Sequence, residues 1–294
     1  MSATGHRCWV CGAARLEVAK RGDLTRDLES RDFAITDAHY GRTGEIHECA
    51  GCGFLQCSDQ SDVLGFYEAL EDEVYDATRS ARERQARRLL ERIRPFRPGA
   101  RLLDVGAGSG ILVARAAALG YRAEGVEPSL WLQRRATERG LAVELGTLPH
   151  PKLEGPYDVV TLIDVLEHVP DPVGLLERAR EVTAPDGVVA IVTPDVRSLA
   201  ARLLGWRWWH FRVAHVGYFS RATLRLALQR AGLGEPRLSR PGWYFPADYL
   251  VERVNTYLPR ALRIPAPRWL GRITVPLNLR DSLLAIATPL EGGR

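Results

Sequence analysis

The chain has almost no lysine, a single methionine and no long apolar run. Lys20 and Lys152 are the only lysines among 294 residues, although the chain has 40 basic side chains in all. No stretch approaches the roughly 20 consecutive apolar residues of a membrane-spanning helix. The first residues contain no apolar segment of the signal-peptide kind, so we expect a cytoplasmic protein. With 46% hydrophobic and 26% charged residues, the composition excludes a largely disordered or fibrous chain.

The positive charge is concentrated in the last third of the chain. Residues 195–294 contain 16 basic and six acidic side chains, whereas residues 1–60 contain seven and nine. This asymmetry predicts a negatively charged partner or substrate, such as a phosphate, a nucleotide-sugar, RNA or an acidic lipid surface; a solvated basic face is the alternative. No lysine-rich tract could follow a nucleic-acid backbone and the N-terminal region is slightly acidic, so we do not expect a nucleic-acid partner.

Apolar strands and amphipathic helices alternate from about residue 79 onward. Apolar runs at 101–106, 121–126, 157–164 and 187–193 are separated by segments with helical periodicity. Strands that alternate with helices form a mostly parallel sheet covered by helices on both faces. We therefore predict a doubly wound α/β fold.

A glycine-rich loop follows the first of these strands. Asp104 begins the pattern D-x-G-x-G-x-G, which ends at Gly110, where the next helix starts. Glycines let the backbone approach a ligand closely, and the helix N-terminus faces that ligand. An NAD site would show G-x-G-x-x-G instead. The loop resembles motif I of the class I S-adenosylmethionine-dependent methyltransferases, whose fold is a Rossmann-like, mostly parallel sheet of seven strands.

The resemblance covers about residues 62–235. Glu127 ends the second strand, where a carboxylate can bind both ribose hydroxyls. Thr147 follows the third strand, where many relatives have an Asp beside the adenine, and Asp164 precedes a stretch similar to the family's LEHVxDP. The resemblance implies that S-adenosylmethionine is bound by Asp104, Gly106, Ala107, Gly108, Gly110, Glu127, Pro128, Thr147, Leu148 and Asp164.

Four of the five cysteines form two C-x-x-C pairs. Cys8 pairs with Cys11, and Cys49 with Cys52. Thiolates with this arrangement can share one tetrahedral zinc ion from two turns, as in a zinc ribbon. Disulfides are the alternative, but they are unusual in cytosolic proteins, and no thioredoxin-like unit follows either pair. We predict a structural zinc with no open coordination position, and we expect Cys57 to be a small buried residue.

The predicted chain has three parts. Residues 1–60 form a zinc ribbon without a core of its own, residues 61–98 a helical connector, and residues 99–294 the methyltransferase domain. The ribbon followed by Phe66, Tyr67 and Tyr75 resembles bacterial methyltransferases that begin with such a module. Several of those act on sugars or on polysaccharide and natural-product precursors.

Two insertions of the methyltransferase domain, 195–219 and 241–280, should cover the carboxyl edge of the sheet, where ligands of doubly wound folds bind. Aromatic rings beside arginine and histidine suit a sugar ring with a phosphate or nucleotide attached. A hydrophobic clamp is the alternative for the first insertion, and a membrane-surface or dimer contact for the second. The predicted substrate residues are Trp206, Trp209, His210, Arg212 and Tyr218.

The function favoured by these patterns is O-methylation of a sugar, glycan or natural-product hydroxyl. Methylation of an RNA base, C- or N-methylation of a nucleotide-sugar, and a catalytically silent binding protein are the alternatives. A hydroxyl acceptor benefits from a nearby proton acceptor, and histidine is best matched to that role near neutral pH. We predict His168 or His215 as the base, with Glu167 as a potential orienting partner.

Overall fold

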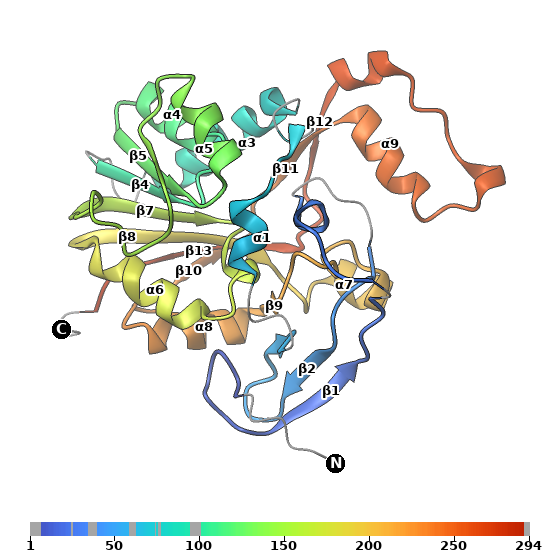
Figure 1. Cartoon of the computed structure of the whole chain (residues 1–294), viewed down its shortest axis with the longest axis horizontal. Coiled ribbons are helices and arrows are strands. Elements are labelled where there is room, and N and C mark those ends of the chain that lie inside the picture. Colours follow the sequence, from blue (N-terminus) through green and yellow to red (C-terminus); the bar gives the residue numbers. More distant parts are fainter. Residues whose placement is uncertain are drawn as a thin grey trace.

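A seven-stranded sheet forms the centre of the protein (Figure 1). The computed structural model describes residues 7–24, 26–34, 40–58, 63–73, 75, 78–94 and 101–290. The sheet order is β10-β13-β8-β7-β4-β5-β6. Neighbouring strands from β8 to β6 pair in parallel, whereas β13 pairs antiparallel with both β8 and β10. The strands are β4 (Arg101–Val105), β5 (Arg122–Glu127), β6 (Val143–Leu145), β7 (Tyr157–Ile163), β8 (Thr183–Pro194), β10 (Arg237–Ser239) and β13 (Ser282–Ala287). The predicted fold class is confirmed.

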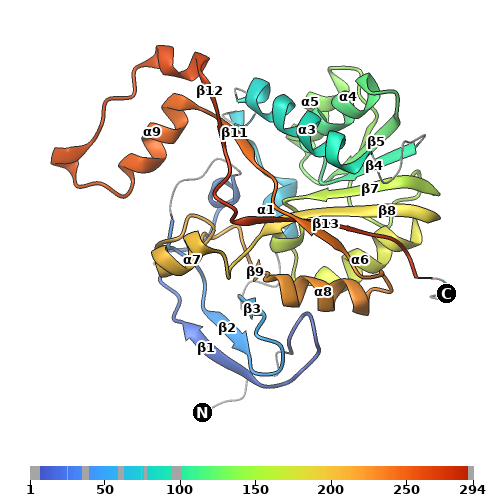
Figure 2. The same ribbon diagram turned by 180° about the vertical axis from the view of Figure 1, so that it is seen from behind.

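Helices cover both faces of this sheet, as the view from behind also shows (Figure 2). Successive side chains of a strand point to opposite faces. Val188 and Ala190 of β8 therefore pack with α3 and α4, whereas Val189 and Ile191 pack with α6 and α8. This two-sided burial explains why the strands are continuously apolar. The helices are α3 (Arg79–Ile93), α4 (Ile111–Ala118), α5 (Leu130–Thr137), α6 (Pro172–Glu181) and α8 (Arg221–Arg230).

Three of these helices are capped at their N-terminus by a side chain. The hydroxyls of Ser129 and Ser220 accept backbone N–H bonds at the starts of α5 and α8, and the Asp171 carboxylate does so for α6. β6 is short, at Val143–Leu145, and β8 begins at Thr183, before the predicted apolar run at 187–193, because it continues to pair with the first residue of β7.

Residues 7–58 contribute three strands to a small antiparallel sheet whose order is β1-β2-β3-β9. Its strands are β1 (Leu16–Lys20), β2 (Ile46–Cys49), β3 (Leu55–Gln56) and β9 (Gly217–Tyr218), and the short helices nearby are η1 (Ser30–Phe33), α1 (Leu64–Glu68), α7 (Leu199–Leu204) and η3 (Gly205–Arg207). The last strand belongs to the segment 195–219, and Phe33 packs in one apolar cluster with Trp208. The N-terminal module therefore shares its core with that segment. The predicted boundaries at residues 60/61 and 98/99 lie outside the described residues.

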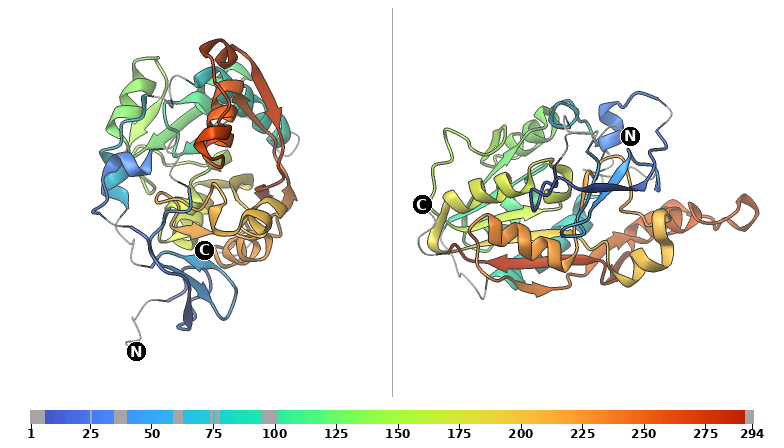
Figure 3. Two further views of the ribbon diagram at one scale, coloured as in Figure 1. Left: turned by 90° about the vertical axis from the view of Figure 1, so that its right-hand side faces the viewer. Right: turned by 90° about the horizontal axis from the view of Figure 1, so that it is seen from below.

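Residues 243–277, which we call the arm, project from the edge of the molecule (Figure 3). The arm consists of β11 (Trp243–Pro246), α9 (Ala247–Asn255), η4 (Arg260–Leu262), η5 (Arg268–Arg272) and β12 (Thr274–Leu277). β11 and β12 pair antiparallel with each other and form a separate two-stranded sheet. Within the described part of the chain, no helix has the length and apolar character needed to cross a membrane.

Candidate active site

The loop between β4 and α4 turns on three glycines with left-handed backbone conformations. Gly106, Gly108 and Gly110 have φ of 73°, 54° and 73°. A Cβ atom at Gly106 would lie 2.6 Å from Val165, and one at Gly108 would lie 2.7 Å from the Tyr75 hydroxyl. Both the backbone conformation and the lack of space therefore require glycine here. The loop therefore makes a tight turn directly before the N-terminus of α4, where backbone N–H groups can face a ligand.

Two buried carboxylates lie beside this loop. The oxygens of Glu127, at the end of β5, accept hydrogen bonds from the backbone N–H groups of Gly108 (2.8 Å) and Ser129 (2.9 Å). Asp104 accepts a 2.7 Å bond from the Thr161 hydroxyl. Burial raises the pKa of both Asp104 and Glu127 to about 7. A ligand that carries a positive charge would favour their ionised forms.

A cavity of about 850 Å³ begins at the loop and reaches the arm. Nine of the ten predicted cofactor residues line it: Asp104, Gly106, Ala107, Gly108, Glu127, Pro128, Thr147, Leu148 and Asp164. Gly110 does not line it. That glycine is the N-cap of α4, and a Cβ atom there would lie 2.6 Å from Leu141. Glycine is therefore required at position 110 for the close packing of α4 and not for direct contact with a ligand.

Asp164 follows β7 with a φ of 53°, an unusual conformation for a residue other than glycine. Its side chain lines the cavity, and burial raises its pKa to about 7, an effect that Arg82 opposes and Asp281 increases. Backbone strain of this kind persists where the surrounding structure holds it, and it is frequent at binding sites.

Glu167, His168 and His215 form a compact cluster on the cavity wall. Each offers one donor atom, and these three atoms lie within 4.8 Å of one another. Glu167 Oε2 accepts a 2.9 Å bond from the Thr193 hydroxyl, whereas Glu167 Oε1 and His215 Nδ1 are buried with no hydrogen-bond partner among the described residues. Burial raises the pKa of Glu167 well above its usual range, and it lowers the pKa of His168 to about 4. Burial also lowers the pKa of His215 well below its usual range, so both imidazole rings are neutral near pH 7.

The hydrogen bonds of His168 determine its tautomer. Its Nδ1 lies 2.7 Å from the Ala214 carbonyl oxygen and 2.5 Å from Tyr67 Oη, which itself lies 3.2 Å from the same carbonyl. A carbonyl oxygen only accepts hydrogen bonds, so Nδ1 must carry the proton. The lone pair of the neutral ring is then on Nε2. His168 is thereby prepared to accept a proton or a hydrogen bond with that atom.

The segment 195–219 contributes three of the five predicted substrate residues to the cavity wall: Trp209, His210 and Arg212. The Trp209 indole donates a 3.0 Å bond to Asp281, and His210 Nε2 lies 3.5 Å from the same carboxylate oxygen. Burial alone would raise the pKa of Asp281, but the contacts with His210 and Trp209 lower it. Arg212 is buried and donates to the Ala34 carbonyl.

The other two predicted substrate residues do not line the cavity. Tyr218 belongs to β9 and is buried in the apolar cluster shared with the N-terminal module, with its ring 4.9 Å from Phe211. Trp206 is 39% exposed, and its ring centroid lies 4.7 Å from that of Phe211. Strand pairing and core packing, which the sequence pattern did not reveal, explain why these aromatic side chains point elsewhere.

Several cavity residues were not in the predicted site. Tyr40 and Tyr67 come from the N-terminal module and the connector, and Tyr249 and Arg253 come from the arm. The Arg253 guanidinium lies over the rings of Tyr249 (4.4 Å) and Tyr40 (5.5 Å). Two sequence signals pointed to them: the Phe66-Tyr67 pair, which is part of the resemblance, and the insertion 241–280, which is predicted to cover this edge of the sheet. The cavity wall is therefore assembled from all parts of the chain.

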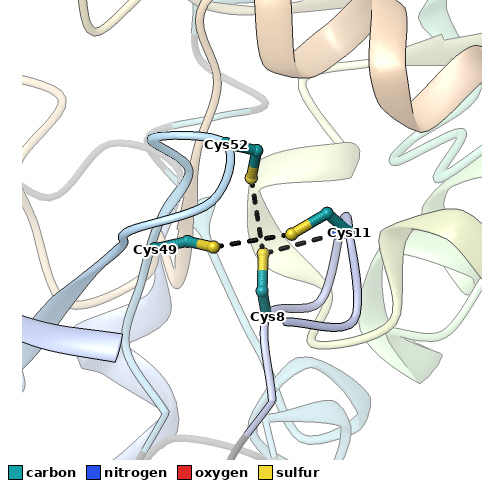
Figure 4. A group of neighbouring side chains, drawn as sticks. All are labelled: Cys8, Cys11, Cys49 and Cys52. Carbon is teal, nitrogen blue, oxygen red and sulfur yellow. Dashed lines mark hydrogen bonds between the residues drawn. The ribbon is translucent and has the colours of Figure 1, made fainter. Parts of the chain in front are cut away.

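The four paired cysteines meet at one point, with their sulfur atoms directed toward one another (Figure 4). Cys8 Sγ lies 3.6 Å from Cys52 Sγ, and Cys11 Sγ lies 3.5 Å from Cys49 Sγ. A tetrahedral ion with Zn–S bonds of about 2.3 Å requires sulfur separations of roughly 3.8 Å, so the four residues fit zinc. Cys57 is buried outside this group.

Both cysteine turns have the same backbone pattern. The N–H of Gly12 donates to the Cys8 carbonyl (2.9 Å), and the N–H of Gly53 donates to the Cys49 carbonyl (2.8 Å). Each glycine has a positive φ, 75° and 73°. Two equivalent turns that direct their thiols to a common centre are the arrangement that a shared metal ion needs.

Comparison with known proteins gives a consistent assignment. A family model described as a methyltransferase domain matches residues 78–234, more than half of the chain. Ubiquinone biosynthesis O-methyltransferases are similar to it: that of Bordetella bronchiseptica is 38% identical over 103 residues (32% of this chain and 43% of that protein), and that of Haemophilus ducreyi is 36% identical over 118 residues (36% and 50%). The match thus spans about half the length of these relatives.

The fold is also shared with a solved structure. An S-adenosylmethionine-dependent methyltransferase from Archaeoglobus fulgidus superimposes with a TM-score of 0.51 at 17% identity, over 74% of this chain and all of that chain. This likeness concerns the fold alone, and it agrees with the sheet order described above. The chain belongs to the methyltransferase-domain family, and its large domain has the class I S-adenosylmethionine-dependent methyltransferase fold.

Proposed function

We propose that the protein methylates a hydroxyl oxygen of a sugar, glycan or natural-product acceptor. The observation that carries this proposal is the single cavity in which Glu127 and the glycine loop lie on one part of the wall and the Glu167–His168–His215 cluster on another. The O-methyltransferase names of the similar proteins support transfer to oxygen. The sugar-related acceptor class rests on the resemblance of the cysteine module to ribbon-bearing bacterial relatives.

The cofactor would lie along the carboxyl ends of β4, β5 and β7. We place its ribose at the Glu127 carboxylate and its amino-acid end between Asp104 and the backbone of Gly106 and Gly108. Thr147 and Leu148 would border the adenine. When bound, S-adenosylmethionine supplies a methyl group on a positively charged sulfur. That positive charge would lower the raised pKa values of these buried carboxyl groups and favour the ionised forms, which stabilise it.

The acceptor hydroxyl would face His168 and His215. Nε2 of His168 carries a lone pair and could accept the hydroxyl proton while the oxygen attacks the methyl carbon. His215 has an unpartnered buried nitrogen within reach of the same point, so it is the second candidate for this role. Glu167 would be a positioning residue because the Thr193 hydroxyl orients one of its oxygens toward this cluster. Alignment of the acceptor hydroxyl with the methyl group would contribute the rest of the rate enhancement.

The rest of the acceptor would contact Trp209, His210 and Arg212. An indole face suits the apolar face of a sugar ring, and a guanidinium suits a phosphate. Arg178 and Arg253 also line the cavity, together with the carboxyl groups of Asp171 and Asp281, so its wall contains groups of both charges. Trp206 and Tyr218 are excluded from this proposal by their positions outside the cavity wall.

We also propose a structural zinc ion on Cys8, Cys11, Cys49 and Cys52. Zinc bound by four thiolates has no open position, so its contribution would be to the fold of residues 1–60 and not to methyl transfer. The ribbon would in turn hold β3 against β9 and so support the segment that carries His210, Arg212 and His215.

A panel of acceptors with labelled S-adenosylmethionine tests the proposed function. Free sugars, nucleotide-sugars and hydroxylated aromatic natural products are incubated with the full chain, and the methylated atom is identified by mass spectrometry and NMR. We expect an O-methyl product whose formation is lost in the His168→Ala, His215→Ala double variant. A C- or N-methyl product, or transfer only to RNA, would show that the proposed acceptor is wrong.

A further inference from the structure

The outer end of the arm presents apolar side chains to solvent. Every residue of the segment 259–265, which we call the tip, is exposed. Leu262 and Ile264 are 65% and 50% exposed, and Trp269 nearby is 60% exposed. Scattered apolar residues are common on protein surfaces, but several on one projecting element indicate a contact surface.

The tip is held in place and is not an unstructured extension. The Asn255 side chain donates to the Ile264 carbonyl and accepts from the Ile264 N–H, both at 2.8 Å. This pair of bonds closes the loop from the end of α9 to residue 264. Just after α9, the Tyr257 hydroxyl donates a 2.9 Å bond to the Arg207 carbonyl. The exposed side chains are therefore presented by a defined backbone.

The same surface is strongly basic. The segment 241–280 contains six arginines and two acidic residues. Arg260 and Arg263 are in the tip, on either side of Leu262, and Arg272 is also exposed. Among the residues that the structure describes, these three arginines have no carboxylate partner. Their positive charges are available to an external anionic surface.

We propose that the tip of the arm docks on an anionic lipid bilayer. Arginines that alternate with leucine and isoleucine, with a tryptophan beside them, match the chemistry of the membrane interface: the apolar side chains enter the acyl boundary, and the guanidinium groups remain at the anionic headgroups. A protein partner would need a complementary surface, whereas a bilayer accepts this projecting shape without one.

Docking in this way would bring the cavity next to the membrane. Residues of the inner arm, including Trp243, Phe245, Tyr249 and Leu250, line the same cavity as the glycine loop. The tip residues Arg260, Leu262, Arg263 and Ile264 do not line it. Binding to the bilayer is therefore separable from binding of the cofactor and the acceptor, and it can be tested without turnover.

Co-sedimentation with lipid vesicles tests the proposal. The full chain is mixed with vesicles of phosphatidylcholine containing phosphatidylglycerol, and with phosphatidylcholine alone. We expect binding to the anionic vesicles that weakens as salt is added. The double variant Arg260→Gln, Arg263→Gln should bind about 30-fold more weakly, roughly fivefold for each arginine. Leu262→Asp should weaken binding even at low salt because it removes the apolar contact.

Matched variants on the opposite side of the molecule control for general charge and hydrophobicity. Arg122 and Arg134 are exposed, and Leu130 is 42% exposed on α5. Arg122→Gln with Arg134→Gln, and Leu130→Asp, should bind vesicles like the parent. Unchanged calorimetric binding of S-adenosylmethionine by the tip variants would show that they are folded.

Three outcomes would overturn the proposal. These are a parent protein that does not bind anionic vesicles, tip variants that bind as tightly as the parent, and controls that weaken binding as much as the tip variants. Concentration-dependent self-association that Leu262→Asp abolishes, without vesicle binding by the parent, would instead assign the tip to a contact between two copies of this chain.

Discussion

Tyr67 Oη lies 2.5 Å from His168 Nδ1, although the two residues are 101 positions apart in the chain. Their rings meet edge to face with centroids 5.4 Å apart. Tyr67 belongs to α1 of the connector, and His168 follows β7 of the large sheet. The connector thus helps to orient a proposed proton acceptor. The proposed catalytic site therefore depends on residues outside the large domain as well as on those within it.

Replacement of Tyr67 by Phe should lower kcat by about fivefold while affinity for S-adenosylmethionine is unchanged. The hydroxyl contributes one hydrogen bond to the orientation of the His168 ring, and a bond of this kind is worth about 1 kcal/mol. Tyr157→Phe removes a buried hydroxyl outside the cavity and serves as the control. An equal loss of activity in both variants would indicate general destabilisation instead.

Removal of the imidazole should affect the chemical step directly. His168→Ala or His215→Ala, whichever residue is the base, should lower single-turnover methyl transfer by about 100-fold or more, with cofactor affinity retained. Rapid-quench measurement with a known acceptor gives this rate. If both single variants transfer the methyl group at the parent rate, histidine base catalysis at these positions is excluded.

Glu127→Gln should weaken binding of S-adenosylmethionine by about 10- to 100-fold. The amide is isosteric, but it replaces charge-assisted bonds to the ribose hydroxyls and also disturbs the bonds from Gly108 and Ser129. Glu124→Gln changes a carboxylate on the same strand that pairs with Arg101, and it should bind the cofactor like the parent. Calorimetry compares the two, and equal affinities would disprove the ribose assignment.

Cofactor affinity should rise with pH through neutrality. In the free protein the pKa values of Asp104, Glu127 and Asp164 are about 7, so these carboxyls are substantially protonated below that pH. A positively charged cofactor favours the ionised forms, so binding must release protons and becomes weaker as pH falls. Calorimetry in buffers with different ionisation enthalpies, between about pH 6 and about pH 8, measures the release. Binding without proton release would contradict the prediction.

Purified protein should contain about one zinc ion per chain. Cys49→Ser removes one of four thiolates and should lose the metal and most of the fold of residues 7–58. Cys57→Ser changes a buried cysteine outside the cluster and should retain the full equivalent. Metal analysis by mass spectrometry distinguishes the two variants. A folded, metal-free parent would show that the cysteines have another role.

Local patterns were sufficient to predict the class of fold and much of the cofactor side of the cavity. Strands buried on both faces must be continuously apolar, and a backbone turn with positive φ must contain glycine, so both leave a record in the sequence at adjacent positions. Asp104, Glu127 and Asp164 were predictable because each lies near the carboxyl end of such a strand or directly after it. Their convergence on one cavity follows from parallel strands, whose carboxyl ends share one edge.

Only the tertiary structure decided which aromatic side chains reach the acceptor side. Tyr218 and Trp209 look equivalent in the sequence, yet strand pairing with residue 55 buries the first, and a hydrogen bond to Asp281 holds the second on the cavity wall. Tyr67 reaches His168 because the connector packs across the sheet edge, a contact between distant segments that no local periodicity records. Local rules act within a few residues, whereas the acceptor site depends on long-range packing, and that is the physical reason for the difference.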